Sequence, residues 1–325
     1  MAEHNRPGSV RVAAAAARKR WPIVTMPTFL IIGAAKTGTT SMYEYLQQHP
    51  DIFMSAVKEP WHFASHAMRR WTGPDGDWLQ LRARYLDLAR MENYEALFEG
   101  GTHALARGEA SAIYLHTEGC AKRIRAALPD ARLMVLFRDP VDRAFSQFKV
   151  NLQQNRETAG SFAEAVRLEE ERIRQGWSPD FHYVRRGFYY RQLEPYLRLF
   201  PREHLRIYLY EDIVKDTAVV VRDAYAFLGV DPDFTPDTER RYNISGTPAR
   251  AALPRLLRGA SPVAAFVRCL VPKVLRQPIR LRLKRVAEKK IVVDPQTRAD
   301  LIKEYRPDIL KLQEMLGRDL GPWMS

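Results

Sequence analysis

An apolar strand pattern that runs into a small-residue turn and a helix start is the feature that most constrains this chain. The stretch "FLIIGAAKTGTTSMYEYLQQHP" spans residues 29–50. It is apolar up to Gly33, small residues follow to Gly38, and the pattern predicts a helix that opens at Thr39–Thr40. Small residues let backbone N–H groups approach an anion, and the following helix adds its positive end. The stretch therefore predicts an anion-binding loop in an α/β fold.

The lysine of this loop is displaced from its place in the nucleotide-binding pattern GxxxxGK[ST]. Gly33 and Gly38 keep the spacing, but Thr39 stands where the lysine belongs and Lys36 lies inside the loop. A metal-dependent phosphotransferase also has an acidic residue after a later apolar strand. Here "RLMVLF" runs into Arg138 instead. Fixed cations in place of a metal site favour transfer of a group less charged than phosphoryl, such as sulfuryl; a kinase-like P-loop phosphotransferase is the alternative.

Apolar strand-like segments alternate with helical patterns along the chain. The strand-like segments are 29–33, 52–56, 104–111, 132–138 and 204–213, with helices predicted at 39–48, 118–128, 139–155 and 216–228. Such alternation predicts an α/β fold with a parallel sheet flanked by helices on both faces. Ligands of these sheets bind beyond the carboxyl ends of the strands, so Gly33–Gly38, Ser111 and Arg138 are expected around one crevice.

No internal repeat and no glycine/serine linker divides the chain. We therefore expect a flexible N-terminal arm over 1–25 and a single domain over 26–325. The two cysteines, Cys120 and Cys269, form no disulfide framework, and no segment approaches the roughly 20 apolar residues that span a bilayer. These features favour a cytoplasmic protein.

The formal net charge of +13 calls for anionic partners, and much of it lies in one segment. Between Arg240 and Ala287 there is no aspartate or glutamate, while lysine and arginine recur throughout. The part from 251 to 290 is read as a basic, acid-free covering segment. A solvated face, an anionic substrate groove and peripheral contact with a membrane are the open alternatives. Few aromatic residues interleave with these cations, which disfavours nucleic acid as a partner.

Several motifs in order resemble those of sulfotransferases that use 3′-phosphoadenosine-5′-phosphosulfate (PAPS). They are "GAAKTGTTS", "HPDIFMSAVKEPWHF", "GEASAIYL", "LFRDPVDRAFSQF", "GFYYRQLEPYLRLFPREHLRIYLYEDI" and "LKLQEMLGRDLGPW". The chain is more similar to the heparan-sulfate-type and bacterial branch than to the branch that sulfates small phenols. The resemblance implies a P-loop nucleotide-kinase-like sulfotransferase fold. It also implies direct in-line transfer without a metal ion to a hydroxyl or amine of a glycan, glycolipid or secondary metabolite.

The resemblance also assigns donor-site roles. The residues implied for the 5′-phosphosulfate are Ala35, Lys36, Thr37, Gly38, Thr39, Thr40 and Ser41. Lys36 would contact the bridging oxygen between phosphate and sulfate and stabilise the charge of the leaving adenosine 3′,5′-bisphosphate. Arg138 and Ser146 would hold the 3′-phosphate, unless Arg138 is a structural partner of Asp139 or Asp142. Weaker matches place Tyr190, Ser245 and Arg250 at the nucleotide.

A general base is implied for the acceptor's proton. Glu59 in "KEP" is the favoured base, against the reading of a surface glutamate paired with Lys58. His62 is a rival that is expected instead to pack under the loop. Glu109 is either a second carboxylate near the acceptor or a buried partner of Arg107 or Lys36. Where some glycan-modifying relatives carry a lysine before the serine of this motif, the present chain has Ala110.

Overall fold

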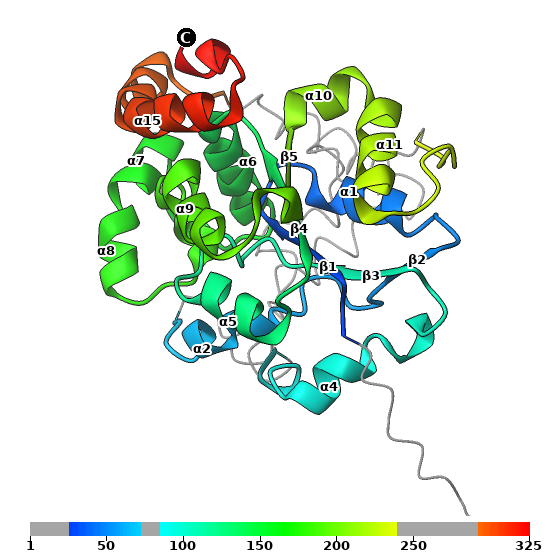
Figure 1. The fold of residues 1–325 in the computed structure, drawn as a ribbon. Helices are drawn as coiled ribbons and strands as arrows, with labels where there is room; N and C mark the ends of the chain where they lie inside the picture. The colour runs from blue at the N-terminus through cyan, green and yellow to red at the C-terminus, as the bar shows by residue number, and fades with distance from the viewer. Residues whose placement is uncertain (1–25, 73–84, 239–291) are drawn as a thin grey trace, which may run out of the picture.

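The computed structural model describes residues 26–72, 85–238 and 292–325. Its strands form one parallel sheet in the order β2-β3-β1-β4-β5, as Figure 1 shows. They span Phe29–Gly33 (β1), Ile52–Met54 (β2), Ala106–Ala110 (β3), Arg132–Phe137 (β4) and Leu205–Leu209 (β5). The central strand, β1, pairs with β3 on one side and with β4 on the other. The predicted parallel sheet is confirmed.

Helices cover both faces of this sheet, as predicted. Leu30 and Ile32 of β1 belong to a core shared with α5, α6, α9 and α15, while Phe29 and Ile31 face α1 and α11. This alternation follows from the period of two along a strand. The α-helices are α1 (Thr39–Leu46), α2 (Ser65–Met68), α4 (Met91–Ala96), α5 (Cys120–Ala127), α6 (Pro140–Gln153), α7 (Phe162–Arg167), α8 (Glu169–Arg174), α9 (Tyr189–Leu199), α10 (Tyr210–Lys215), α11 (Thr217–Leu228) and α15 (Pro295–Leu316). Short 3₁₀ turns include η1 (His62–Ala64), η3 (Pro179–Phe181) and η4 (Arg185–Gly187).

The start of α6 is fixed by its own sequence. The Asp139 side chain accepts from the backbone N–H groups of Val141 and Asp142, and Pro140 occupies the first helical position. Both features favour a helix start. Because β4 ends at Phe137 and the cap lies at Asp139, Arg138 is held between the strand end and the helix.

The C-terminal helix α15 packs against α6 and α9. Arg298 forms ion pairs of 2.6 Å with Asp139 and 3.2 Å with Asp142 at the start of α6. The Asp308 carboxylate accepts from the backbone N–H of Tyr190 at 2.9 Å. A Cβ at Gly187 would lie 2.6 Å from the Tyr305 ring, so glycine there permits close packing. Residues 292–325 thus pack on the same side of the sheet as α5, α6 and α9.

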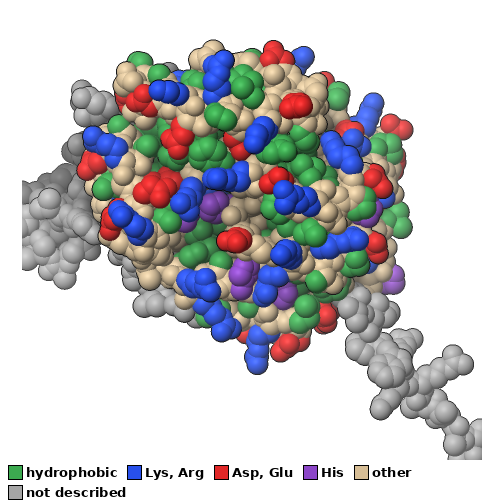
Figure 2. All heavy atoms as spheres, turned by 60° about the vertical axis from the view of Figure 1, so that its left-hand side comes forward, with side chains coloured by type: hydrophobic (Ala, Val, Ile, Leu, Met, Phe, Trp, Pro, Cys, Tyr) green, Lys and Arg blue, Asp and Glu red, His purple; other side chains and the backbone are tan. Residues whose placement is uncertain are grey.

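Several predictions lie outside the described residues: the arm 1–25, Ser245, Arg250 and the basic segment 251–290. None of the helices formed by the described residues is long and apolar enough to cross a membrane. Seen from the side of α7, α8 and α9, lysine and arginine side chains alternate with acidic ones and with histidines (Figure 2). On this face the positive charge of the chain does not gather into one patch.

Candidate active site

The loop that follows β1 presents unpaired backbone donors. The Thr37 hydroxyl donates to the Ala34 carbonyl at 2.6 Å and closes the turn, and Gly38 adopts a left-handed backbone with φ of 100° before α1 begins. Among the described residues, no hydrogen-bond acceptor is found for the backbone N–H groups of residues 35–40. The first N–H groups of a helix have no partner within the helix itself. The loop therefore has the donors and the helix end that an anion site needs.

Lys36 lies in this loop within a group of charges. Burial lowers the pKa of its ammonium group, and the nearby carboxylate of Asp180 opposes that shift. Three further cations are close enough to lower it as well: Arg186, Lys58 and Arg138. Cations held together in this way are stabilised by a bound anion. The structure thus brings Lys36 and Arg138 together at the strand ends, as expected.

Glu59 lies in the segment after β2 and is fixed by three donors. Its Oε2 accepts from the backbone N–H of Ala112 at 2.9 Å and from the Trp61 indole N–H at 2.8 Å. Its Oε1 accepts from the Lys58 ammonium at 3.1 Å. The pairing with Lys58, which is the alternative to a catalytic role, is present, and the other two contacts orient the carboxylate in addition. Because Oε2 carries two donors, Oε1 is the oxygen better placed to receive a proton.

The backbone is strained around these groups. Lys36, Glu59 and Trp61 have φ values of 71°, 58° and 58°, and they are three of the four non-glycine residues with left-handed φ in the described part of the chain. Such conformations cost about 1–3 kcal/mol each and cluster at functional sites. Neither the glutamate nor the tryptophan carries a sequence signal for this conformation.

The rival bases lie in an aromatic core. The His62 ring stacks on Tyr94 with centroids 4.1 Å apart, and its Nδ1 lies 3.0 Å from the Leu88 carbonyl oxygen, so it packs under the loop as expected. Glu109 is fully buried on β3, where its Oε1 accepts from the Tyr94 hydroxyl at 3.2 Å. Of the two alternatives for Glu109, a buried pairing with Arg107 or Lys36 is therefore wrong. The Arg107 side chain instead donates to backbone carbonyls.

Glu109 leads to a prediction about stability. Burial raises its pKa to about 8 from an ordinary value of 4.5. Between these two values the folded protein keeps a proton that the unfolded chain has lost, so the free energy of unfolding falls as pH rises through this window. From pH 6.5 to 8, ionisation of Glu109 is expected to lower the free energy of unfolding by about 2 kcal/mol.

Glu109→Gln should remove this pH-dependent fall in the free energy of unfolding, because the amide resembles the protonated carboxyl. Urea unfolding of the wild-type and variant proteins at pH 6.5, 7.5 and 8.5 measures the free energy. The difference between the two proteins isolates Glu109 from Glu169, whose pKa burial also raises, to about 7. Parallel curves for the two proteins would show that Glu109 is ionised throughout.

Arg138 lies between β4 and α6, and Ser146 lies within α6, as predicted. The Arg138 guanidinium lies 3.4 Å from Asp142 and stacks over the Tyr210 ring, 4.7 Å from its centroid. Ser146 is buried two turns into the helix. The ion pair with Asp142 corresponds to the structural alternative. That carboxylate is shared with Arg298, which leaves Arg138 partly unneutralised.

Tyr190 lies at the contact between α9 and α15. The Lys311 ammonium lies 5.8 Å from the centroid of the Tyr190 ring, and the backbone N–H of Tyr190 donates to the Asp308 carboxylate. A role of Tyr190 at a nucleotide stays a prediction.

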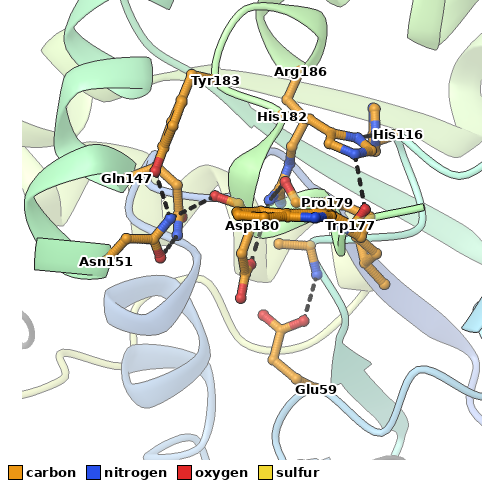
Figure 3. Close-up of polar contacts among 12 residues, drawn as sticks. Glu59, His116, Gln147, Asn151, Trp177, Pro179, Asp180, His182, Tyr183 and Arg186 are labelled. Carbon is orange, nitrogen blue, oxygen red and sulfur yellow. Dashed lines mark hydrogen bonds and ion pairs between the residues drawn. The ribbon is translucent and has the colours of Figure 1, made fainter. Parts of the chain in front are cut away.

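Sequence reasoning missed the segment between α8 and α9. Asp180 and Arg186 on this segment are electrostatic neighbours of Lys36. Figure 3 shows the Asp180 carboxylate pointing toward that of Glu59. Arg186 is buried, whereas its sequence neighbour Arg185 is exposed. The only sequence signal is the pair of arginines in "RRG".

The described residues contain no group of three or more His, Cys, Asp or Glu side chains that could hold a metal ion. Against known families, the profile described as "Sulfotransferase family" matches residues 27–236. The chain belongs to the sulfotransferase family. It is thus an enzyme of the sulfotransferase class, and sulfuryl transfer is the reaction of that class.

Individual sulfotransferases match over different lengths. A crystal structure of a sulfotransferase from Alicyclobacillus acidocaldarius is 34% identical and has a TM-score of 0.72, covering 93% of this chain and 100% of that one. The human heparan sulfate glucosamine 3-O-sulfotransferase 6 is 27% identical over 98% of this chain and 79% of its own length. The membrane-associated sulfotransferase kil1 of Dictyostelium discoideum is 30% identical over 40% of this chain, and the match spans 24% of kil1. The P-loop-like sulfotransferase fold is confirmed.

Proposed function

We propose that this sulfotransferase takes the sulfuryl group from PAPS and transfers it to a hydroxyl or amine of a glycan or small-molecule acceptor. The observation that carries the proposal is the Lys36 loop, with its unpaired N–H groups and neighbouring cations. The glycan class is supported by the name of the human relative, a heparan sulfate glucosamine 3-O-sulfotransferase. A cytoplasmic location and membrane contact through 251–290 stay predictions.

The residues present fit a donor with two separated anionic groups. The turn over residues 35–40 and Lys36 would hold the 5′-phosphosulfate, with the hydroxyls of Thr39, Thr40 and Ser41 nearby. Arg138, at the end of the neighbouring strand β4, and Ser146, within α6, would hold the 3′-phosphate. Because α15 completes the start of α6 through Arg298, we treat residues 26–325 as one catalytic unit.

When bound, the donor supplies the sulfuryl group: its bond to the bridging oxygen breaks, the electron pair stays on that oxygen, and sulfur bonds to the acceptor oxygen or nitrogen. Lys36 would donate a hydrogen bond to the bridging oxygen and stabilise its developing charge. Oε1 of Glu59 accepts the acceptor's proton, while Ala112 and Trp61 hold Oε2 in place. The contacts with Ala112, Trp61 and Lys58 orient the Glu59 carboxylate before the acceptor arrives.

Calorimetric titration with adenosine 3′,5′-bisphosphate in EDTA tests the donor site. Wild-type protein should bind, and Arg138→Ala should weaken binding by about tenfold or more because a charge-assisted hydrogen bond to phosphate is lost. Arg206→Ala is a matched control, and it should leave binding unchanged. Arg206 on β5 is half-exposed and forms an ion pair with Asp223 on α11.

Two outcomes would count against the donor site. If folded wild-type protein does not bind this nucleotide, the loop holds another anion. If ATP with magnesium binds instead, the phosphotransferase alternative is restored.

A further inference from the structure

The segment from Trp177 to Gly187 is held rigidly on α6 by buried polar contacts. The Asn151 amide donates to the Asp180 carbonyl at 2.9 Å and lies 2.7 Å from the Tyr183 hydroxyl (Figure 3). That hydroxyl in turn donates to Glu157, which forms a buried ion pair with Arg172. Buried networks whose members are satisfied in this way rigidify the backbone that they hold. Side chains on this segment are therefore fixed in advance of any ligand.

Arg186 is the buried cation of this segment. It is 4% exposed, and its Nη1 donates to the Pro179 carbonyl at 3.1 Å and lies 3.7 Å from Oδ1 of Asp180. Asp180 is shared, since its Oδ2 also lies 2.7 Å from Arg156. Burial lowers the pKa of Arg186 to about 10, which still leaves it charged at neutral pH. One shared carboxylate at 3.7 Å leaves a buried guanidinium incompletely neutralised.

The charge of Arg186 acts on both ends of the proposed reaction. Lys36, which would stabilise the leaving oxygen, and Glu59, which would accept the proton, are both its electrostatic neighbours. In Figure 3 the Arg186 side chain extends toward Asp180, beyond which the Glu59 carboxylate lies. If Lys36 and Glu59 have the proposed roles, the sulfuryl group passes between them. Residue 110, at the end of β3, is an alanine and supplies no cation.

We propose that Arg186 contacts the oxygens of the sulfuryl group while it passes from the bridging oxygen to the acceptor, and that Asp180 orients it for this contact. The inference rests on the proposed use of PAPS. The sulfur–oxygen bond to the donor breaks, the bond from sulfur to the acceptor forms, and Arg186 takes up no proton. A rigid guanidinium presents paired N–H donors to such oxygens, and a cation fixed in advance needs little reorganisation.

Comparing PAPS with adenosine 3′,5′-bisphosphate isolates the sulfuryl group, because the two nucleotides differ only in that group. Calorimetry without acceptor gives both dissociation constants. Arg186→Met should raise the dissociation constant for PAPS by about tenfold or more, because one charge-assisted hydrogen bond is lost. The constant for the bisphosphate should stay within about twofold of the wild-type value. Arg185→Met is the matched control, because Arg185 is adjacent and exposed, and neither constant should change.

The controls separate failure of the inference from failure of the proposed function. If wild-type protein binds neither nucleotide, PAPS use fails and the role of Arg186 fails with it. If wild-type protein binds both nucleotides but Arg186→Met weakens binding of both equally or of neither, only the role of Arg186 is overturned.

If a thermal melt shows that Arg186→Met does not fold, Arg186→Lys is used as the test variant instead. It keeps the charge without the paired donors, so PAPS binding alone should weaken severalfold, and unchanged PAPS binding would overturn the proposal.

Discussion

Lys36→Ala is expected to lower the rate of sulfuryl transfer by about 10²–10³ while the protein stays folded. In the proposed mechanism the ammonium group acts on charge that develops on the leaving oxygen, so its loss should affect the transition state more than the bound nucleotide. The fold should tolerate the change, because Lys36 lies in the loop after β1 and does not belong to either apolar core cluster of the described residues. Removing one cation also relieves its repulsion with Arg186, Lys58 and Arg138.

The rate is measured as conversion of PAPS to adenosine 3′,5′-bisphosphate by chromatography, with a mixed panel of glycan and phenolic acceptors. The bisphosphate forms whichever acceptor in the panel is sulfated, so one readout serves all of them. Lys122→Ala, at an exposed position on α5, is the control and should match wild-type protein. Turnover of Lys36→Ala close to that of wild-type protein would show that the leaving-group role is wrong.

Glu59→Gln is expected to lower the same rate by about 10²–10⁴, the usual contribution of a general base. The amide oxygen can still accept from Ala112 and Trp61, so the loop geometry should survive. Affinity for adenosine 3′,5′-bisphosphate should not fall, since in the proposed mechanism the carboxylate acts on the acceptor's proton and not on the nucleotide.

Comparison with Glu109→Gln identifies the base. If Glu59 is the base, Glu109→Gln should keep most of the activity. If Glu109→Gln is the inactive variant and Glu59→Gln is active, the base is the buried carboxylate on β3. The control Glu92→Gln, at an exposed residue at the start of α4, should be neutral.

The sheet and the donor loop could be predicted because their signals are local. β1 and β4 are buried on both faces and read as continuous apolar runs. The cap at Asp139 and the proline after it mark the start of α6. Since parallel strands end at one edge, the convergence of the Lys36 loop with Arg138 followed from the fold class alone.

The rest of the site depends on contacts between distant segments. Asp180 and Arg186 reach Lys36 because α6 holds their segment through Asn151, more than a hundred residues beyond the loop. Nothing in "RRG" tells the buried arginine from the exposed one. The partner of Glu109 could not be read from the sequence for a similar reason, because Tyr94 reaches it from α4.

The order of the strands also determines when the site can assemble during folding. β1 is central, and its residue Phe29 aligns with Gly108 of β3 on one side and with Arg132 of β4 on the other. The sheet that supports the Lys36 loop therefore forms only after these distant segments have paired. Parallel pairings of this kind form slowly. The helix start beside Arg138 is complete only when Arg298 has docked on Asp139. A nascent chain therefore lacks the complete proposed donor pocket until Arg298 has been synthesised and has reached Asp139. A nucleotide bound there would stabilise the finished fold without guiding its early steps.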